Sequence, residues 1–312
     1  MHIFSNVMGI FVFDGQFRIV EEIPFNTAGD YKNKERTIKE VKLRHENAKD
    51  PDEAALKTIL TYFMNKKYYE RFYSQNLKVT KLDVKNSVKD DTLIMQAINS
   101  IDELDRSINS LSKKLREWYG LYNPEFSKSE QDHEKFAAEI ITTGKKELLD
   151  RIKISHDDSM GADLSQSNID AINNLAEKIN SLFQMRKDMF DYISSLMDSL
   201  CPNIKTVCGP LVAARLLEHA GSLKRLSELP SSTIQILGAE TALFRHMKTG
   251  ARPPRHGVIV HHPLIAKASE KMHGKVARSL ADKISIAAKI DYFKGEFIGD
   301  KLLKELEAKF EK

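Results

Sequence analysis

The sequence has few cysteines and no long apolar runs. Only two of its 312 residues are cysteine, Cys201 and Cys208, which is too few for a four-cysteine metal site. Nothing in the sequence indicates secretion, so we expect both thiols to be reduced and buried in an intracellular protein. Apolar runs stay shorter than about eighteen residues, and no basic segment followed by an apolar run opens the chain. We therefore expect no transmembrane helix, no membrane partner and no signal peptide.

Motifs for catalysis and cofactor binding are missing as well. The chain has no glycine-rich loop that could hold a phosphate and no His/Glu spacing typical of a metal site. His261 and His262 are adjacent, and side chains of neighbouring residues in an extended segment point to opposite faces. Arg215, Glu218 and His219 share one helical turn, but such polar clusters arise by chance on helix surfaces. We predict that the protein is not an enzyme, with no catalytic residue, no metal and no cofactor.

Charge is distributed unevenly along an otherwise ordinary composition. A content of 41% hydrophobic and 29% charged residues is typical of a globular protein, and the length predicts two or three compact units. Residues 203–295 contain 15 Lys and Arg against 6 Asp and Glu, whereas the rest of the chain contains 33 against 38. This concentration of positive charge is typical of a surface that binds a polyanion. A solvated basic face without a ligand is the alternative.

The centre of this basic region combines cations, an aromatic ring and prolines. Arg and Lys side chains suit phosphate oxygens, and a ring can stack on an unpaired base. Two successive prolines restrict the backbone and lower the cost of ordering a loop that meets a ligand. The segment therefore predicts a presented loop, although Phe244 could instead belong to the core. The residues concerned are Phe244, Arg245, Lys248, Arg252, Pro253, Pro254 and Arg255.

Four blocks of this region, in this order and spacing, resemble the Nop-domain family. They are Gly209-Pro-Leu-Val-Ala-Ala-Arg-Leu-Leu-Glu-His-Ala-Gly-Ser-Leu223, Leu229-Pro-Ser-Ser-Thr-Ile-Gln-Ile-Leu-Gly-Ala-Glu240, Ala242-Leu-Phe-Arg245 and Lys283-Ile-Ser-Ile-Ala-Ala-Lys-Ile-Asp291. Upstream segments around Asp91, Ile101, Trp118 and Ser159 extend the resemblance over most of the chain. The pattern is most similar to the archaeal scaffold of box C/D particles for RNA-guided methylation.

The resemblance implies a scaffold for 2'-O-methylation of rRNA or tRNA. Its expected partners are the methyltransferase fibrillarin, a kink-turn-binding ribosomal-protein-like subunit, the box C/D guide RNA, the substrate RNA and a second copy of this chain. It also implies a cytoplasmic location in an archaeal cell, or a nucleolar one in a eukaryote. The alternatives are a general helical nucleic-acid-binding protein, an RNA-processing enzyme and a spliceosomal-type Nop-domain protein that binds snRNA.

Charge, loop chemistry and this resemblance together predict the residues that bind RNA or the assembled particle. In the family, the block Ala242–Arg245 lies near the end of the guide and substrate duplex. The position after Glu240 is often Lys in the family but is Thr241 here, which removes one possible contact. The predicted residues are Gly238, Ala239, Glu240, Ala242, Leu243, Phe244, Arg245, Lys248, Arg252, Arg255, His256, Lys275, Arg278, Lys283 and Lys289.

Two long helices with apolar seams are predicted between residues 94 and 200. Apolar residues recur every three or four positions from Ile94 through Ala97 to Trp118, and again from Ile172 to Leu200 with one interruption at Arg186. This period favours an antiparallel coiled coil over single amphipathic helices, and the seams can pair within one chain or between two copies. The predicted dimerisation residues are Ile94, Ile101, Leu104, Ile108, Leu111, Leu115, Ile172, Ile179, Phe183, Phe190, Ile193 and Met197.

The first 84 residues predict a small α/β domain. Asp14-Gly15 between two β-rich runs, 9–13 and 16–20, predicts a two-residue hairpin turn. A helix is expected from Pro51 towards Tyr69, followed by a strand over Leu77–Val84. Aromatic residues are dense here, which indicates either a crowded core or an apolar docking face.

The whole sequence thus predicts a mainly α-helical protein with a small α/β N-terminal domain. Residues 1–84 form that domain, which by resemblance binds fibrillarin. Residues 85–201 form a coiled-coil hairpin with a small helical tip, for dimerisation. Residues 202–295 form an all-helical domain, which by resemblance is a Nop domain that binds RNA or the assembled particle, and residues 296–312 form a charged helical tail.

Overall fold

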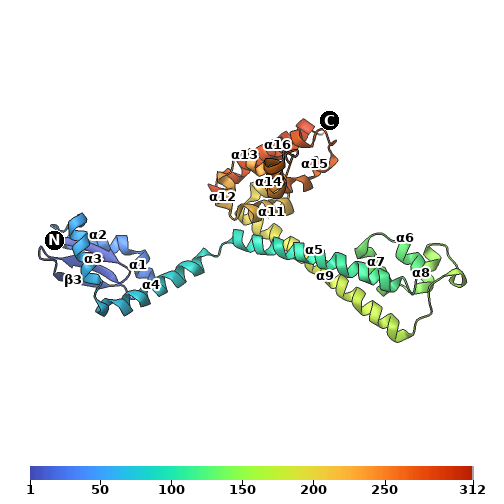
Figure 1. The fold of residues 1–312 in the computed structure, drawn as a ribbon, viewed down its shortest axis with the longest axis horizontal. Coiled ribbons are helices and arrows are strands. Elements are labelled where there is room, and N and C mark those ends of the chain that lie inside the picture. The colour runs from blue at the N-terminus through green and yellow to red at the C-terminus, as the bar shows by residue number, and fades with distance from the viewer. Residues whose placement is uncertain (311–312) are drawn as a thin grey trace. The chain divides into compact units, whose positions relative to one another are not determined.

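The structure is a computed structural model that describes residues 1–310, and it divides into two compact units. The first unit comprises residues 1–89, and the second begins at Asp90 (Figure 1). Both are mainly helical, and the sheet belongs to the first unit, which confirms the predicted fold class. Within residues 1–310 no helix is both long and apolar enough to cross a membrane.

A three-stranded antiparallel sheet forms the centre of the first unit. Strand β2 (Gly9–Phe13) lies between β1 (His2–Asn6) and β3 (Ile19–Pro24), and all five of its residues are buried. Its alternating side chains enter two clusters: Ile10 and Val12 pack with Phe25, and Phe11 and Phe13 pack with Ile59. Four helices accompany the sheet: α1 (Ala28–Lys32), α2 (Lys34–Arg44), α3 (Glu53–Phe63) and α4 (Lys66–Ser87).

The β2–β3 connection is a hairpin, but the predicted two-residue turn is wrong. The loop runs from Asp14 to Arg18, and β3 begins only at Ile19. The Asp14 carboxylate accepts the backbone N–H groups of Gln16 and Arg18 at 2.8 and 2.9 Å. The left-handed residue is Phe17 (φ 57°), not Gly15. The aspartate therefore closes the loop through its side chain rather than through a tight Asp-Gly turn.

The predicted strand at Leu77–Val84 is also wrong, because α4 continues through it to Ser87. No glycine or proline interrupts residues 66–87, and the eight alternating residues are short enough to fit either period. The helix expected from Pro51 towards Tyr69 is two helices. Asp52 caps the first, with Pro51 one residue before the cap, and Asn65 caps the second.

A long antiparallel hairpin begins the second unit and confirms the predicted coiled coil. Helices α5 (Asp90–Tyr119) and α9 (Gln166–Leu200) run side by side (Figure 1). The hairpin tip contains α6 (Pro124–Ser129), α7 (His133–Thr142), α8 (Lys145–Arg151) and the 3-10 helix η1 (His156–Asp158).

The two seams face each other within this single chain. Arg186, which interrupts the second seam, forms an ion pair with Asp105 of α5. Trp118, predicted to continue the first seam, is exposed instead, and Tyr119 is buried in its place. Eight of the twelve predicted dimerisation residues are buried by their own chain: Ile94, Ile101, Ile108, Leu115, Ile172, Ile179, Ile193 and Met197. These eight side chains are therefore unavailable to a second copy, and only Leu104, Leu111, Phe183 and Phe190 stay partly open.

Short helices form the rest of the second unit around one apolar core. They are α10 (Pro202–Cys208), α11 (Pro210–Ala220), α12 (Leu223–Glu228), α13 (Ser231–Ile236), α14 (Glu240–Thr249), η2 (Val258–His261), α15 (Pro263–Lys267), α16 (His273–Tyr292) and α17 (Gly299–Phe310). Both cysteine thiols are free and buried. Burial raises the pKa of the Cys208 thiol well above its usual range, so it stays protonated. The helix predicted as a charged tail, α17, buries Leu302 and Leu306 in this core.

Polar contacts fix these helices to the hairpin and to one another. The Asp102 carboxylate on α5 pairs with Arg215 of α11 at 2.7 Å, and Asp91 accepts the backbone N–H that opens α12 at 3.4 Å. Deeper in the core, the Asp291 carboxylate accepts the N–H groups of Asn203 and Ile204. Because these contacts join elements far apart in sequence, the C-terminal helices and the hairpin form one frame.

Candidate nucleic-acid interface

Helix α14 projects from the C-terminal helices, and two glycines hold its base. Gly238, just before the helix, has φ 84°, and a Cβ there would lie 2.4 Å from Val258 Cγ1. Gly257, where the chain returns, packs so closely that a Cβ would lie 1.8 Å from the carbonyl oxygen of Leu237. The backbone N–H groups of Gly257 and Val258 also donate to Gln235 and Leu237, each at 2.8 Å. Only glycine permits these approaches, so the backbone itself sets where α14 begins and where the chain returns.

Electrostatics support the first turn of α14. The Glu240 carboxylate accepts the backbone N–H of Gly238 at 2.8 Å. Partial burial opposes ionisation, but the N–H groups of Gly238 and Glu240 hold the pKa of this carboxyl below its usual range. Gly250, in the left-handed region at φ 67°, ends the helix. Glu240 therefore stabilises the projection locally.

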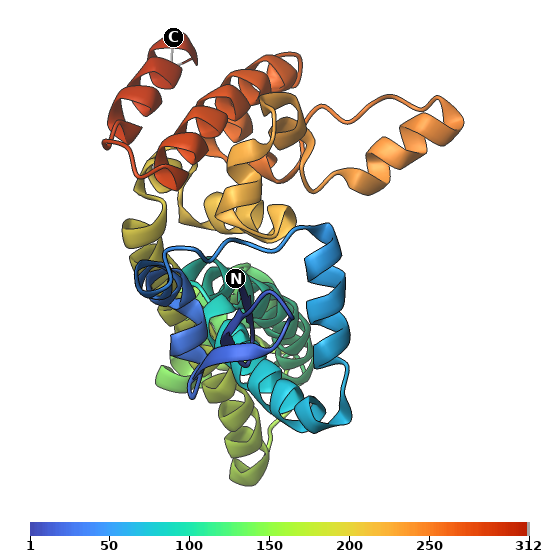
Figure 2. The same ribbon diagram turned by 90° about the vertical axis from the view of Figure 1, so that its left-hand side faces the viewer.

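None of the residues of α14 is buried, and the helix stands apart from its neighbours (orange in Figure 2). The Phe244 side chain is 61% exposed and Met247, one turn later, is 71% exposed. The alternative that Phe244 belongs to the core is therefore wrong. A ring and a thioether presented on one turn of a projecting helix can stack on, or pack against, a flat ligand such as a terminal base pair.

Three predicted cations surround this apolar tip without an acidic partner among residues 1–310. Arg245 and Lys248 lie on α14, and Arg252 follows Gly250 in the returning loop. Arg255 is different, because its guanidinium donates to the backbone carbonyl of Glu270 at 3.0 Å and also meets the Glu270 carboxylate. Arg255 therefore anchors the returning loop, while the first three cations are free to meet phosphates.

The predicted cations of α16 do not form one set. Lys275 and Arg278 are exposed near its first turns, which the Arg255–Glu270 contact and the His256–His273 ring pair (5.8 Å) connect to the α14 loop. Burial, together with His273 and Arg255, lowers the pKa of His256. Lys283 is bound to Glu305 of α17, and Lys289 lies near the far end of the helix. The structure thus joins Lys275 and Arg278, but not Lys283 or Lys289, to the α14 projection.

The remaining predicted residues form the base of the projection. Gly238 and Ala239 precede α14, whereas Ala242 and Leu243 are half-buried on its inner side. Leu243 lines a hollow beneath the helix together with His219 and Arg225. Sequence reasoning missed Arg225, Met247 and His273. The spacing of Met247 one turn after Phe244 was the available signal.

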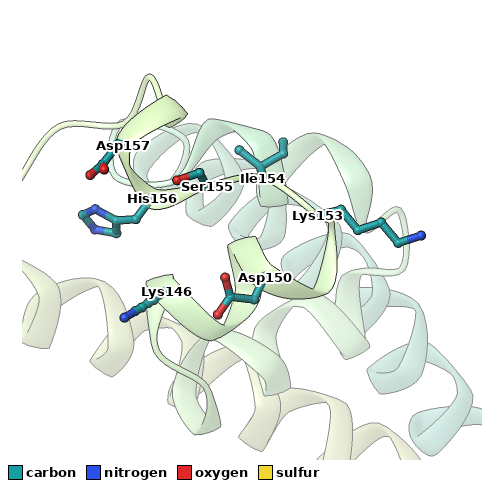
Figure 3. A pocket seen from close by; sticks show the side chains of 7 residues that line it. All are labelled: Lys146, Asp150, Lys153, Ile154, Ser155, His156 and Asp157. Carbon is teal, nitrogen blue, oxygen red and sulfur yellow. The ribbon is translucent and has the colours of Figure 1, made fainter.

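A larger hollow lies at the hairpin tip and has a mixed character. Lys146 and Asp150 of α8 face His156 across it, while Lys153 points away (Figure 3). Its other lining residues are Ile154, Ser155 and Asp157. Cations and carboxylates alternate there, so no single charge dominates. This hollow therefore does not resemble the basic surface around α14.

The polar cluster on α11 has a structural role. Arg215 is engaged with Asp102, and His219 Nε2 lies 3.5 Å from the neighbouring Glu218 carboxylate. Among residues 1–310, no three His, Cys, Asp or Glu side chains come close enough together to hold a metal ion.

Comparisons with known proteins show which family the chain resembles. The profile of the Nop family, described as "snoRNA binding domain, fibrillarin", matches residues 100–312. A NOP5 family protein of Methanocaldococcus jannaschii is 38% identical over 268 residues, 81% of this chain and 64% of that protein. Nucleolar protein 56 of Schizosaccharomyces pombe is 39% identical over 67% of this chain and 46% of its own length. Nucleolar protein 58 of Neosartorya fischeri is 39% identical over 65% of this chain. The chain thus spans less than two-thirds of these relatives, 37% in the last case.

One solved structure, titled as a fibrillarin/Nop5p complex, contains a chain that resembles this one. It shares 27% identity over 99% of this chain and 98% of that chain, with a TM-score of 0.45. That score is too low to establish a common arrangement of the whole chain.

Proposed function

The chain belongs to the Nop family, and from this premise we propose that it is the non-catalytic scaffold of a box C/D-type guide ribonucleoprotein. In this proposal the α14 projection binds guide RNA already loaded with a kink-turn-binding ribosomal-protein-like subunit, close to the substrate duplex. The first unit recruits fibrillarin, and the hairpin pairs with a second copy. The methyl transfer itself belongs to fibrillarin.

The exposed tip of α14 carries the RNA part of the proposal. Phe244 and Met247 present apolar surface, and Arg245, Lys248 and Arg252 surround it without ion pairs in the described chain. A stacking surface ringed by cations suits the end of a nucleic-acid duplex, whose last base pair exposes a flat face between two phosphate strands. Solubility alone does not require an exposed phenyl ring and an exposed thioether one turn apart on a projecting helix.

An exposed aromatic stripe supports fibrillarin recruitment by the first unit. Tyr69, Tyr73 and Leu77 lie one turn apart on α4, with Phe72 beside them, and all four are exposed. The Tyr69 and Tyr73 rings stack at 6.4 Å. Because the core of this unit already holds Phe11, Phe13 and Phe25, the stripe is surplus to folding. Tyrosine-rich apolar surface of this kind is typical of protein–protein contacts.

A second apolar face on the hairpin supports self-association. Helices α5 and α9 each carry a row of apolar residues beside the buried seam. Because the two helices are antiparallel, both rows lie on the same side of the hairpin. The opposite side already contacts α7 through Lys187–Glu134 and α11 through Asp102–Arg215. We call the uncovered side the open face; it consists of Leu104, Leu111, Trp118, Leu182, Met185, Met189 and Tyr192, all half-buried or exposed.

The proposal is tested by RNA binding as a function of salt. The triple variant Arg245→Ala, Lys248→Ala, Arg252→Ala should bind the subunit-loaded kink-turn RNA more weakly. The slope of log affinity against log salt should fall by about 2 to 3 units, since each lost phosphate contact removes roughly 0.7 to 0.9. Phe244→Ala should instead cost about 1 to 3 kcal/mol of binding with little change in slope.

A matched control separates this effect from net charge. Lys113→Ala, Lys128→Ala, Lys178→Ala removes the same charge from exposed hairpin positions that have no ion pair in the described chain. It should bind like the wild type. If the salt slope of the α14 variant is unchanged, these cations do not contact RNA phosphates and are ordinary solvated surface charges.

A further inference from the structure

A second group of exposed rings lies at the other end of α16, in the turn that leads to α17. Phe293 is 76% exposed and Phe297 is 51% exposed, with Tyr292 beside them. The Tyr292 and Phe293 rings meet edge to face at 5.0 Å. We call residues 289–297 the aromatic turn. None of its exposed rings is needed by the core on the inner side of α16.

The backbone of this turn is held in an uncommon conformation. Lys294 adopts φ 54°, a left-handed position that glycine usually occupies at a helix end. The N–H of Gly295 returns to the carbonyl of Ile290 at 2.9 Å, and a Cβ on Gly295 would lie 3.1 Å from the Ile290 side chain. A lysine is therefore kept where glycine would be favoured, and this lysine is exposed and directly follows Phe293 in the chain.

Buried polar contacts fix both ends of the turn. The Asp291 carboxylate accepts the side-chain amide of Asn203 at 2.7 Å, in addition to the two backbone N–H groups described above. The Asn203 Oδ1 atom accepts the N–H of Ile298 at 2.7 Å. Phe297 packs on Gly299, where a Cβ would lie 3.0 Å from its ring. The backbone that carries the rings is thus fixed before any ligand arrives, which lowers the cost of ordering this segment on binding.

The charges around the rings favour nucleic acid over protein as the occupant. Lys289 and Lys294 are exposed and have no acidic partner in residues 1–310. The turn contains two acidic residues: Asp291 is buried and hydrogen-bonded to Asn203 and Ile204, and Glu296 is exposed. Lysine is depleted from the centres of protein interfaces, because its ammonium is costly to desolvate. Rings alternating with lysines instead suit unpaired bases, whose faces stack while their phosphates meet the ammonium groups.

We propose that the aromatic turn is a second RNA contact, which stacks unpaired bases of a single-stranded segment. This inference rests on the proposed function, since it extends RNA binding to a separate surface. The α14 loop meets α16 at its first turn, through His256 and His273, whereas Phe293 directly follows its last residue, Tyr292. Twenty helical residues separate the two by about 30 Å, and α14 and α17 lie on opposite sides of the C-terminal helices (Figure 2). One RNA can therefore touch both surfaces only if an unpaired stretch continues beyond its duplex.

The test uses the full-length chain and a short fluorescein-labelled oligoadenylate as the single-stranded probe. The double variant Phe293→Ala, Phe297→Ala should bind this probe about tenfold to a hundredfold more weakly, with an unchanged salt slope. Lys289→Ala, Lys294→Ala should lower the slope by about 1 to 1.5 units. Phe293→Trp should keep the affinity, whereas Phe293→Leu, which retains apolar surface but no ring, should lose it.

Two controls make the outcomes decisive. Ile286→Ala removes exposed apolar surface from the same helix without removing a ring, and it should bind the oligoadenylate like the wild type. The α14 triple variant should also keep oligoadenylate binding while binding the subunit-loaded kink-turn RNA more weakly. Wild-type affinity of this variant for the kink-turn RNA would overturn the proposed function alone. Wild-type affinity in the double ring variant, absence of oligoadenylate binding by the wild type, or full binding by Phe293→Leu would each overturn the aromatic turn as a stacking site. Thermal melting of every variant checks that the core remains folded.

Discussion

The open face of the hairpin gives the most demanding prediction about assembly. Met185 and Tyr192 lie one heptad apart on α9 and are 48% and 42% exposed, whereas the seam of the same helix packs against α5. Replacing both by glutamate should convert a dimer into a folded monomer. The single chain tolerates the change because neither side chain contributes to a buried cluster.

The expected magnitude follows from the uncovered surface. Roughly half of each side chain is open, on the order of 80 Å², so covering it contributes about 2 kcal/mol. A twofold dimer repeats each contact, so the double variant loses four such contributions, about 8 kcal/mol before any charge repulsion. That loss raises the dissociation constant by more than about 10⁵-fold. A dimer of micromolar affinity would then be undetectable.

Sedimentation velocity and light scattering should report this change in mass. The matched control Gln184→Glu, Ser195→Glu adds the same charge on the outer side of α9 and should remain dimeric. Ile179→Glu should behave differently from both, because Ile179 is fully buried between α5 and α9 and a charge there unfolds the hairpin. A wild-type chain that is monomeric at tens of micromolar, or a double variant that keeps the dimer mass, would refute the open face.

Three further perturbations test other parts of the structure. The double variant Tyr69→Ala, Tyr73→Ala should abolish co-purification of fibrillarin with the full chain, because central aromatic contacts in an interface often contribute about 2 kcal/mol or more each. If fibrillarin still co-purifies, the α4 stripe is not its binding surface. The buried His262 ring is hydrogen-bonded to the carbonyl of Val207, and burial lowers its pKa below the ordinary 6.5. As the pH is lowered, the unfolded chain therefore binds this proton first, so the free energy of unfolding of the wild type should decrease as the pH falls from 6.5 to the pKa of the folded state. Thermal melting at several pH values should show a weaker pH dependence for His262→Gln. Lys153, just after α8, has φ 61°, a left-handed conformation that costs less for glycine than for lysine. Lys153→Gly should therefore raise the free energy of unfolding by about 0.5 to 1 kcal/mol in urea titrations. A decrease would mean that the lysine side chain stabilises the hairpin tip.

Long periodic features were predictable from the sequence because many residues repeat the same signal. The seams over Ile94–Leu115 and Ile172–Met197 specify the hairpin through more than three heptads each, and no local preference overrides them. Gly209-Pro210 and Gly221 mark the ends of α11 by fixed backbone preferences. Such signals are local or repeated, so they survive without knowledge of the tertiary structure.

Short or ambiguous features were not predictable. Eight alternating residues at Leu77–Val84 satisfy a strand and a helix equally, and the surrounding helix decides between them. Trp118 fits the seam by spacing, yet Tyr119 takes the buried position because the α6–α7 tip packs from that side. On α9 the residues of the open face repeat every seven positions, at Leu182 and Met189 and at Met185 and Tyr192. This second row could be interpreted only once the first seam was known to pair within the chain.

The exposure of Phe244 could not be read from its residue type, and this exposure carries the strongest argument for a ligand. A ten-residue helix with no buried residue is marginal by itself in water, so α14 depends on its ends: the close-packed glycines at 238 and 257, Glu240 at its start and Gly250 at its stop. All of these stabilising features lie at the base or the ends of the projection. Phe244 and Met247 contribute nothing to them and keep apolar surface in water. Because the fold needs neither side chain and yet holds α14 outward, Phe244 and Met247 are best explained as contacts for a ligand of this helix.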